Sequence, residues 1–376
     1  MLFQRRECML ALLTAMAPAA PAWAAAGALQ PRALQFPRDH GTHNASRTEW
    51  WYLTGHGATA SGQIYGFQVT FFRTRVDATQ ALQSPLAARQ LVFAHAAVSD
   101  VQGQRLWHDQ RIGRWNGEQP TSDATQTRRS AVYASDADTR VHLRDWSLQR
   151  LPDGRYVAHI NAGDFQITLD TRPTQAHLLQ GQQGFSRKGP DPDQSSFYVS
   201  QPQLAVSGRL QFQGRSVALT TGRAWLDHEW SESLLHPDAV GWDWIGMNLD
   251  NGDSLTAFRL RRADGSDLWS GGSWRAAAQG NAPLGARIFD HGTVQFEPLR
   301  WWTSPTTQAR YPVDWRVTTP AGVYTVRGLI DAQELDSRRS TGTVYWEGLS
   351  DLLDAQGQRV GRGYLEMTGY AQRLVL

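Results

Sequence analysis

Short runs of alternating apolar and polar residues, separated by turn sequences, make up most of the chain. In the run 66–72, Phe67, Val69 and Phe71 fall on one face of a strand, because successive strand side chains point to opposite faces. The run 91–98 is apolar on both faces, as expected of a strand inside a packed barrel. Turn sequences rich in Gly, Asn, Asp and Pro recur at 60–62, 152–154, 250–252, 263–265, 320–322 and 355–357. This spacing predicts an all-β protein built from antiparallel sandwiches or barrels.

A tryptophan-rich hairpin pattern occurs twice. The segment 50–53, a turn at Gly62 and the run 67–72 are matched by the segment 242–245, a turn at Gly252 and the run 255–260. Two similar β-barrels in tandem would produce such an echo. We therefore predict an N-terminal domain over residues 25–222 and a C-terminal domain over residues 223–376. Both should be closed or nearly closed antiparallel barrels that meet near residues 205–225, because closure removes exposed strand edges.

The first 24 residues have the pattern of a cleavable signal peptide. Arg5 and Arg6 form a positive start, the run 9–17 is apolar but too short to span a bilayer, and 22–24 reads Ala-Trp-Ala. We expect residues 1–24 to be removed and the mature protein to lie in the periplasm. The arginine pair is compatible with the twin-arginine route, and its flanking residues are equally compatible with Sec export.

Composition and charge narrow the range of partners. The single cysteine, Cys8, lies in the signal segment, so the remaining 376 − 24 = 352 residues contain no thiol. Removing Arg5, Arg6 and Glu7 takes the formal net charge from +2 to +1, which gives no reason to expect nucleic acid as a partner. No later apolar run has the length of a transmembrane helix.

The segment 47–55 places a carboxylate beside three aromatic rings in one predicted strand. Glu49 and Trp51 should point to one face, and Trp50 and Tyr52 to the other. An acid held against large rings can bind a mostly apolar molecule or act chemically on it. The alternative is that the rings are core residues and that Glu49 lies at the edge of the sheet.

A second polar group of residues follows at 227–230. Asp227 and Glu229 share one face of a strand, and His228 and Trp230 share the other. Three neighbouring titratable groups are costly to bury unless they are paired. One interpretation is a structural ion-pair cluster with an arginine, such as Arg223 or Arg73. The other is that one of these groups lines a ligand cavity and donates a proton.

Two further classes of site receive little support from the sequence. His40 and His43, together with the run 227–229, offer nitrogen and oxygen ligands for a metal, but their spacing matches no zinc signature. The chain lacks a Gly-x-Ser-x-Gly motif and the alternating helices that a serine-hydrolase elbow needs. We predict neither a metal nor a cofactor.

Several motifs taken together resemble the AttH-like proteins, the group that includes the carotenoid 1,2-hydratases and many proteins known only as predicted secreted hydrolases. The matching segments extend from about residue 36 to 370; they are 36–40, 49–52, 66–73, 93–96, 224–230, 241–244 and 363–370. The family spans hydratases, relatives that promote cyclisations, and uncharacterised members. The resemblance implies two lipocalin-like barrels in tandem.

Hydratase chemistry needs an acid that stays protonated near neutral pH. Burial in an apolar cavity raises the pKa of a carboxylic acid, and such an acid can protonate an isoprenoid alkene to a tertiary cation. Aromatic faces stabilise the cation, and water or a second alkene then captures it. As catalytic candidates we take Asp227, His228, Glu229 and Glu49. As ligand-binding candidates we take Trp50, Trp51, Tyr52, Trp230, Trp242, Asp243, Trp244, Trp346 and Glu347.

The sequence therefore predicts a periplasmic protein that binds a lipophilic molecule and resembles alkene hydratases. The first alternative is a non-catalytic carrier of a lipid or hydrophobic metabolite, working alongside an envelope export system. The second is a structural envelope protein with filled barrels. An enzyme needs an open pocket with an acid at its apolar end, a carrier needs a pocket without that acid, and a structural protein needs neither.

Overall fold

The computed structural model describes residues 28–119, 131–233, 235–277 and 285–374. The predicted signal peptide therefore lies outside the described residues. Within them, two short 3-10 helices, η1 (Arg38–His40) and η2 (Asp77–Thr79), accompany 24 strands in two antiparallel sheets. No helix in these ranges has the length and apolar character needed to cross a bilayer.

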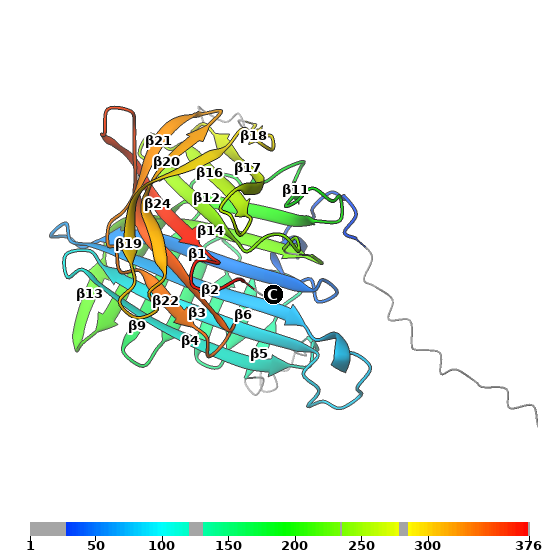
Figure 1. Ribbon diagram of the computed structural model, residues 1–376. Helices are drawn as coiled ribbons and strands as arrows, with labels where there is room; N and C mark the ends of the chain where they lie inside the picture. Colours follow the sequence, from blue (N-terminus) through cyan, green and yellow to red (C-terminus); the bar gives the residue numbers. More distant parts are fainter. Residues whose placement is uncertain (1–27, 120–130, 234, 278–284, 375–376) are drawn as a thin grey trace, which may run out of the picture.

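The first sheet, sheet A, contains fourteen strands and curls into a nearly closed barrel, barrel A (Figure 1). Its strands are β1 (Thr48–Ala58), β2 (Ile64–Arg75), β3 (Gln90–Asp100), β4 (Arg105–Trp115), β5 (Val132–Ala134), β6 (Arg140–Leu143), β7 (Trp146–Arg150), β8 (Tyr156–Asn161), β9 (Phe165–Arg172), β10 (Leu178–Leu179), β11 (Phe185–Arg187), β12 (Ser195–Phe212), β13 (Arg215–Leu219) and β14 (Thr221–Ser231). The main path runs β4-β3-β2-β1-β14-β12-β9-β8-β7-β6-β5.

The second sheet, sheet B, contains ten strands and forms barrel B. Its strands are β15 (Gly241–Leu249), β16 (Ser254–Arg261), β17 (Asp267–Arg275), β18 (Arg287–Phe289), β19 (Gln295–Thr303), β20 (Arg310–Thr319), β21 (Gly322–Gly328), β22 (Glu334–Ser337), β23 (Thr343–Leu353) and β24 (Arg359–Met367). The predicted all-β fold of two tandem lipocalin-like barrels is confirmed.

The two echoed hairpins open the two barrels. β1 pairs with β2 so that Trp50 faces Phe72, and β15 pairs with β16 so that Trp242 faces Leu260. Each hairpin turns at a glycine with positive φ, 82° at Gly62 and 90° at Gly252, a conformation that residues with a Cβ rarely adopt. The repeated sequence pattern therefore corresponds to a repeated structural unit.

The change from sheet A to sheet B comes later in the chain than the sequence analysis placed it. β14, which spans Thr221–Ser231, pairs with β1 and β12 and so belongs to sheet A. The predicted boundary after residue 222 falls inside this strand, and the connection between the sheets is 232–240. Asp227 and Glu229 are therefore residues of barrel A, although the predicted domain limits placed them in the second domain.

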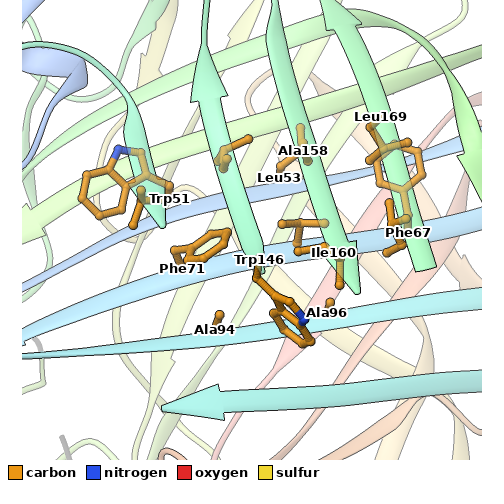
Figure 2. Packing of buried hydrophobic residues seen from close by; sticks show 14 of the residues in the cluster. Trp51, Leu53, Phe67, Phe71, Ala94, Ala96, Trp146, Ala158, Ile160 and Leu169 are labelled. Carbon is orange, nitrogen blue, oxygen red and sulfur yellow. The ribbon is translucent and has the colours of Figure 1, made fainter. Parts of the chain in front are cut away.

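The interior of barrel A is filled by side chains. Every second residue of its strands points inward, and Trp51, Phe67 and Phe71 meet Trp146 and Leu169 from the opposite wall (Figure 2). Barrel B has a corresponding core; its members include Ile245, Met247, Leu255, Trp315, Trp346 and Leu365. The space for a ligand is found instead between the two barrels, as described below.

Candidate functional site

A cavity of about 330 Å³ lies between the outer faces of the two barrels. Its volume is within the usual range for small-molecule sites. Its wall from barrel A includes Trp50, Tyr52, Phe72, Tyr198, Asp227 and Glu229, and its wall from barrel B includes Trp242, Trp244, Phe258, Tyr345, Glu347 and Glu366. Aromatic rings and carboxyl groups thus face each other across one space.

Strand alternation puts the carboxyl groups of barrel A into this cavity. β1 and β14 are neighbours, and their register places Tyr52 opposite Asp227 and Trp50 opposite Glu229. All four side chains project from the outer face of sheet A and line the cavity. The structure therefore has Trp50 and Tyr52 on one face of β1, and Asp227 and Glu229 on one face of β14, as the sequence predicts.

Barrel B presents a matching wall. In β15, Trp242 and Trp244 point outward, and Trp244 lies opposite Glu366 of β24. Glu366 in turn lies opposite Glu347 of β23. Each barrel thus contributes a pair of carboxyl groups beside aromatic side chains of the strand that opens it.

Asp227 is held by three hydrogen-bond donors. The indole Nε1 of Trp225 and the hydroxyl of Ser200 donate to Oδ1 at 2.6 and 2.5 Å, and the hydroxyl of Tyr198 donates to Oδ2 at 2.7 Å. Trp244 of barrel B donates to the Tyr198 oxygen at 3.0 Å. Burial raises the pKa of Asp227 to about 7 against the opposing effect of these donors, and the neighbouring Glu229 adds to the rise. The group therefore titrates near neutral pH.

Glu366 stays protonated to a higher pH than Asp227, and the pKa of Glu347 is raised as well. Burial raises the pKa of Glu366 to about 8, with further contributions from the charges of Asp227 and Glu229. Burial and the adjacent Glu366 hold the pKa of Glu347 well above its usual range. The Tyr52 hydroxyl lies near Glu347. Among the described residues, however, neither this hydroxyl nor Glu347 Oε1 has an aligned hydrogen-bond partner.

Glu229 has a different environment. Its Oε1 accepts a hydrogen bond from Ser196 at 2.5 Å and lies 3.0 Å from the Lys188 ammonium. Lys188 follows β11, and its Nζ lies 4.2 Å from the centre of the Tyr198 ring and 4.5 Å from that of Phe258. The cavity therefore contains an ion pair as well as the carboxyl groups with raised pKa values.

Glu49 belongs to a separate charge network. Its Oε2 lies 2.9 Å from Arg73 Nε, and its Oε1 lies 2.8 Å from His43 Nδ1 and 2.9 Å from His228 Nε2. His43 Nε2 in turn lies 3.0 Å from Asp39. Burial alone would raise the pKa of Glu49, but the charge of Arg73 and the two histidine contacts outweigh it and hold the pKa well below its usual range.

The structure thus divides the catalytic candidates into two groups. Asp227 and Glu229 lie in the cavity with Trp50 and Tyr52. Glu49 instead pairs with Arg73 and contacts His228, whose pKa is lowered by burial. Glu49 and Arg73 also contribute to the cavity lining. The sequence analysis considered Arg73 or Arg223 as an ion-pair partner for residues 227–229. In the structure Arg73 pairs with Glu49, and Arg223 donates a hydrogen bond to Gln203 at 3.2 Å.

Four of the predicted ligand-binding residues lie outside the cavity. Trp51 belongs to the core of barrel A, and Trp230 is buried and stacks on His43 with 3.6 Å between ring centres. Asp243 pairs with Arg259 and Arg261 at 2.8 and 3.0 Å, and Trp346 is a fully buried core residue. Their neighbours in sequence face the cavity, so alternation sends these four to the opposite side.

His43, Glu49 and His228 could together hold a metal ion. Their donor atoms all lie within 4.8 Å of one another and are buried. The carboxylate is already neutralised by Arg73, and a cation beside the guanidinium would be repelled. The donor set therefore fits a hydrogen-bonded charge network better than a metal centre.

An open polar groove lies elsewhere between the barrels. Its volume is about 1190 Å³, and charged residues dominate its lining, among them Asp109, Arg111, Arg144, Asp336 and Arg338. Several of these form ion pairs with each other, such as Arg338 with Asp336 at 2.5 Å. Its polarity does not suit a lipophilic ligand.

The sequence analysis missed three residues that complete the cavity. Glu366 corresponds to Asp227 in the echo, because each lies on the last strand of its barrel, opposite the third residue of the echoed segment, Trp244 or Tyr52. Lys188 is the only lysine in the sequence, which was a visible signal. Tyr198 offered none, since a tyrosine in a strand is ordinary.

The comparison with known families decides the relationship. The profile of the AttH-like family matches residues 27–370. The chain belongs to the AttH-like family. The relationship predicted from the motifs is therefore confirmed.

Solved structures agree with this assignment. A protein described as an AttH from Nitrosomonas europaea is 44% identical, with a TM-score of 0.79 over 91% of this chain and 99% of that chain. Kievitone hydratase from Nectria haematococca is 13% identical, with a TM-score of 0.66 over 90% of this chain and 94% of that chain. CghA is 11% identical, with a TM-score of 0.50 over 88% and 90%. At such low identities the last two show a common fold. No protein of curated function matches the sequence.

Proposed function

We propose that the protein is an enzyme that protonates a lipophilic alkene in the cavity between the barrels and adds water to the resulting cation. One observation carries the proposal: carboxyl groups with raised pKa values, Asp227, Glu347 and Glu366, face the same aromatic-walled space. We expect a carrier to have a pocket without such an acid at its apolar end. The shared fold of kievitone hydratase, which is named for a hydration, supports the same reaction class.

Glu366 and Asp227 have complementary protonation states for this reaction. Near pH 7 Glu366 is mostly protonated, and it gives its proton to one alkene carbon while the other becomes a tertiary cation. The faces of Trp242 and Trp244 stabilise that cation. Water attacks the cation and loses a proton through the Tyr198 hydroxyl to Asp227, and a proton then returns to Glu366. The carbon–oxygen and carbon–hydrogen bonds formed replace the alkene π bond and one O–H bond of water, and no net proton is consumed.

The cavity also limits the substrate. Its volume of about 330 Å³ lies at the lower end of the usual range for small-molecule sites. This size favours a small isoprenoid, or the reacting end of a longer chain, as the substrate.

Isotope labelling tests the reaction. The purified protein would be incubated with small isoprenoid alkenes in deuterium oxide, and in parallel in water labelled with heavy oxygen. Hydration puts deuterium on carbon and labelled oxygen in a tertiary alcohol, whereas cyclisation puts deuterium alone into the product. Recovery of every alkene unchanged and unlabelled, together with native mass spectrometry that finds a bound lipid, would favour a carrier.

Three conservative variants test the assigned roles. Glu366→Gln, Asp227→Asn and Tyr198→Phe should retain ligand binding and lower turnover by roughly two to four orders of magnitude, the usual range for loss of a general acid or base. Glu297→Gln, at a pair exposed on the surface of barrel B, is the matched control. If the first three variants turn over substrate as fast as this control, the assignment fails.

We also propose that residues 1–24 direct export and are removed. The expected result is a periplasmic protein whose amino-terminal sequence begins after Ala24. A product that begins at Met1 would contradict this. Replacement of Arg5 and Arg6 by lysines identifies the route, because only the twin-arginine pathway reads that pair.

A further inference from the structure

The basic residues of the chain are almost all arginines. Of 37 lysines and arginines, Lys188 is the only lysine, so the other 36 are arginines. That one lysine lies in the wall of the cavity between the barrels. Its side chain is 12% exposed. The ammonium group of Lys188 therefore provides a positive charge in the wall of the cavity.

The surroundings of Lys188 leave part of its hydrogen-bonding capacity unused. An ammonium group has three N–H donors. Among the described residues, Lys188 Nζ has one ion-pair partner, Glu229 Oε1 at 3.0 Å, and it lies over the ring faces of Tyr198 and Phe258. Ring faces attract a cation without satisfying its donors as an oxygen does.

Arg73, the second cation in the cavity lining, already uses its donors in hydrogen bonds within the protein. Arg73 donates to Glu49 at 2.9 Å, to Gln90 at 2.7 Å and to the His43 carbonyl at 3.0 Å, and its side chain is fully buried. Among the described lining residues, Lys188 is thus the cation with donors to spare for a ligand.

We propose that Lys188 binds an oxygen of the substrate, either a carboxylate or a carbonyl oxygen, and that the substrate is therefore an amphiphile and not a pure hydrocarbon. This inference rests on the proposed function in taking the cavity as the substrate site. The apolar part of the molecule lies against Phe258, Trp244 and Trp242.

The position of Lys188 relates this oxygen to the reacting groups. Its ring partner Tyr198 donates a hydrogen bond to Asp227, and its ion-pair partner Glu229 is close enough to Glu366 to affect that pKa. A substrate whose oxygen is held at Lys188 therefore has its alkene placed beside the acid and the base. Lys188 is a binding and orienting residue in this arrangement, and it takes no part in the proton transfers.

Binding of saturated probes separates this inference from the reaction. Sodium octanoate, methyl hexyl ketone and octane have similar apolar chains, and none contains an alkene. Their affinities would be measured by titration calorimetry for the unchanged protein and for Lys188→Met, which keeps a flexible apolar side chain and removes the charge. Arg215→Met, which removes a cation over the Phe212 ring outside the cavity, is the matched control.

Lys188→Met should weaken binding of octanoate or of the ketone by on the order of tenfold or more, and leave octane unchanged. If only octanoate binds more weakly to Lys188→Met, Lys188 binds a carboxylate. If the ketone also binds more weakly, Lys188 binds a carbonyl oxygen. Each result supports the inference even if the labelling experiment finds no turnover. Equal affinities in both proteins, or no binding of either oxygenated probe, would overturn it.

Two additional measurements guard against a folding defect. Removing Lys188 leaves Glu229 with an unpaired charge, so Lys188→Met combined with Glu229→Gln restores neutrality and should show the same selective loss. In the unchanged protein, octanoate or the ketone should slow acetylation of the single lysine, read by mass spectrometry of the peptide that contains it. An acetylation rate unaffected by a saturating probe would count against contact with Lys188.

Discussion

At the scale of single residues, two buried carboxyl groups on neighbouring strands have opposite properties. Glu49 contacts Arg73 and two histidines, so its pKa is held well below the usual range. Asp227 contacts only neutral donors, so burial dominates and raises its pKa to about 7. Because the charge of the partners decides the outcome, Asp227 is suited to proton transfer and Glu49 to holding the fold together.

Arg73→Met should destabilise the protein by about 3–5 kcal/mol, because it leaves the buried Glu49 carboxylate without its main counter-charge. Urea unfolding at pH 7 measures the effect. Adding Glu49→Gln should recover part of the loss. The matched control is Arg316→Met, whose pair with Glu297 is half exposed and should be worth less than about 1 kcal/mol. A cost no larger than that of the control would show that the network contributes little.

Glu366 should make stability fall as pH rises. Its folded-state pKa of about 8 lies above its ordinary value of 4.5, so the folded state binds more protons than the unfolded state between these values. Stability from this group is therefore complete below about pH 4.5 and is lost as pH rises toward and through 8. Urea unfolding at pH 5.5, 7 and 8.5 should give a smaller decline for Glu366→Gln than for the unchanged protein. An identical decline in both would refute the raised pKa.

At the scale of elements, β1 serves two purposes through its two faces. Trp51 is a core residue of barrel A, 1% exposed, and its neighbour Trp50 lines the cavity. Trp51→Ala should cost about 3–5 kcal/mol of stability. Trp50→Ala should cost clearly less and should instead weaken ligand binding. Thermal unfolding combined with calorimetric titration of octanoate distinguishes the two, and equal stability losses would contradict the division of faces.

Alternation within strands was predictable from the sequence, and the pairing of barrels was not. The period-two pattern correctly placed Asp227 and Glu229 on one face and His228 on the other, because that depends on the local backbone alone. It could not say whether the strand face that carries Trp346 or Asp243 meets a ligand or the core. That depends on contacts between residues far apart in the chain. The boundary prediction was displaced for the same reason: β14 closes onto β1, nearly the whole first barrel away in sequence.

At the scale of the whole molecule, the site exists only when both barrels are in place. Buried polar contacts cross between them, including Gln68 to Glu347 at 2.8 Å, His95 to Tyr345 at 2.7 Å and Trp244 to Tyr198 at 3.0 Å. An apolar cluster that includes Tyr52, Trp225, Phe258 and Leu349 surrounds these contacts. Separating the barrels would expose the cluster and leave several buried polar groups unpaired, which is costly.

The two barrels should therefore unfold together. Scanning calorimetry of the mature chain is expected to show one transition in which the calorimetric and van't Hoff enthalpies agree. Tyr345→Phe removes the hydroxyl that contacts His95 and Gln68, and at about 1–3 kcal/mol for an unsatisfied buried group it should lower the melting temperature of that one transition without splitting it. Two resolved transitions, with only one moved by Tyr345→Phe, would mean that the barrels are independent units. In that case the cavity between them could open without unfolding, and ligand entry would need no path through either barrel.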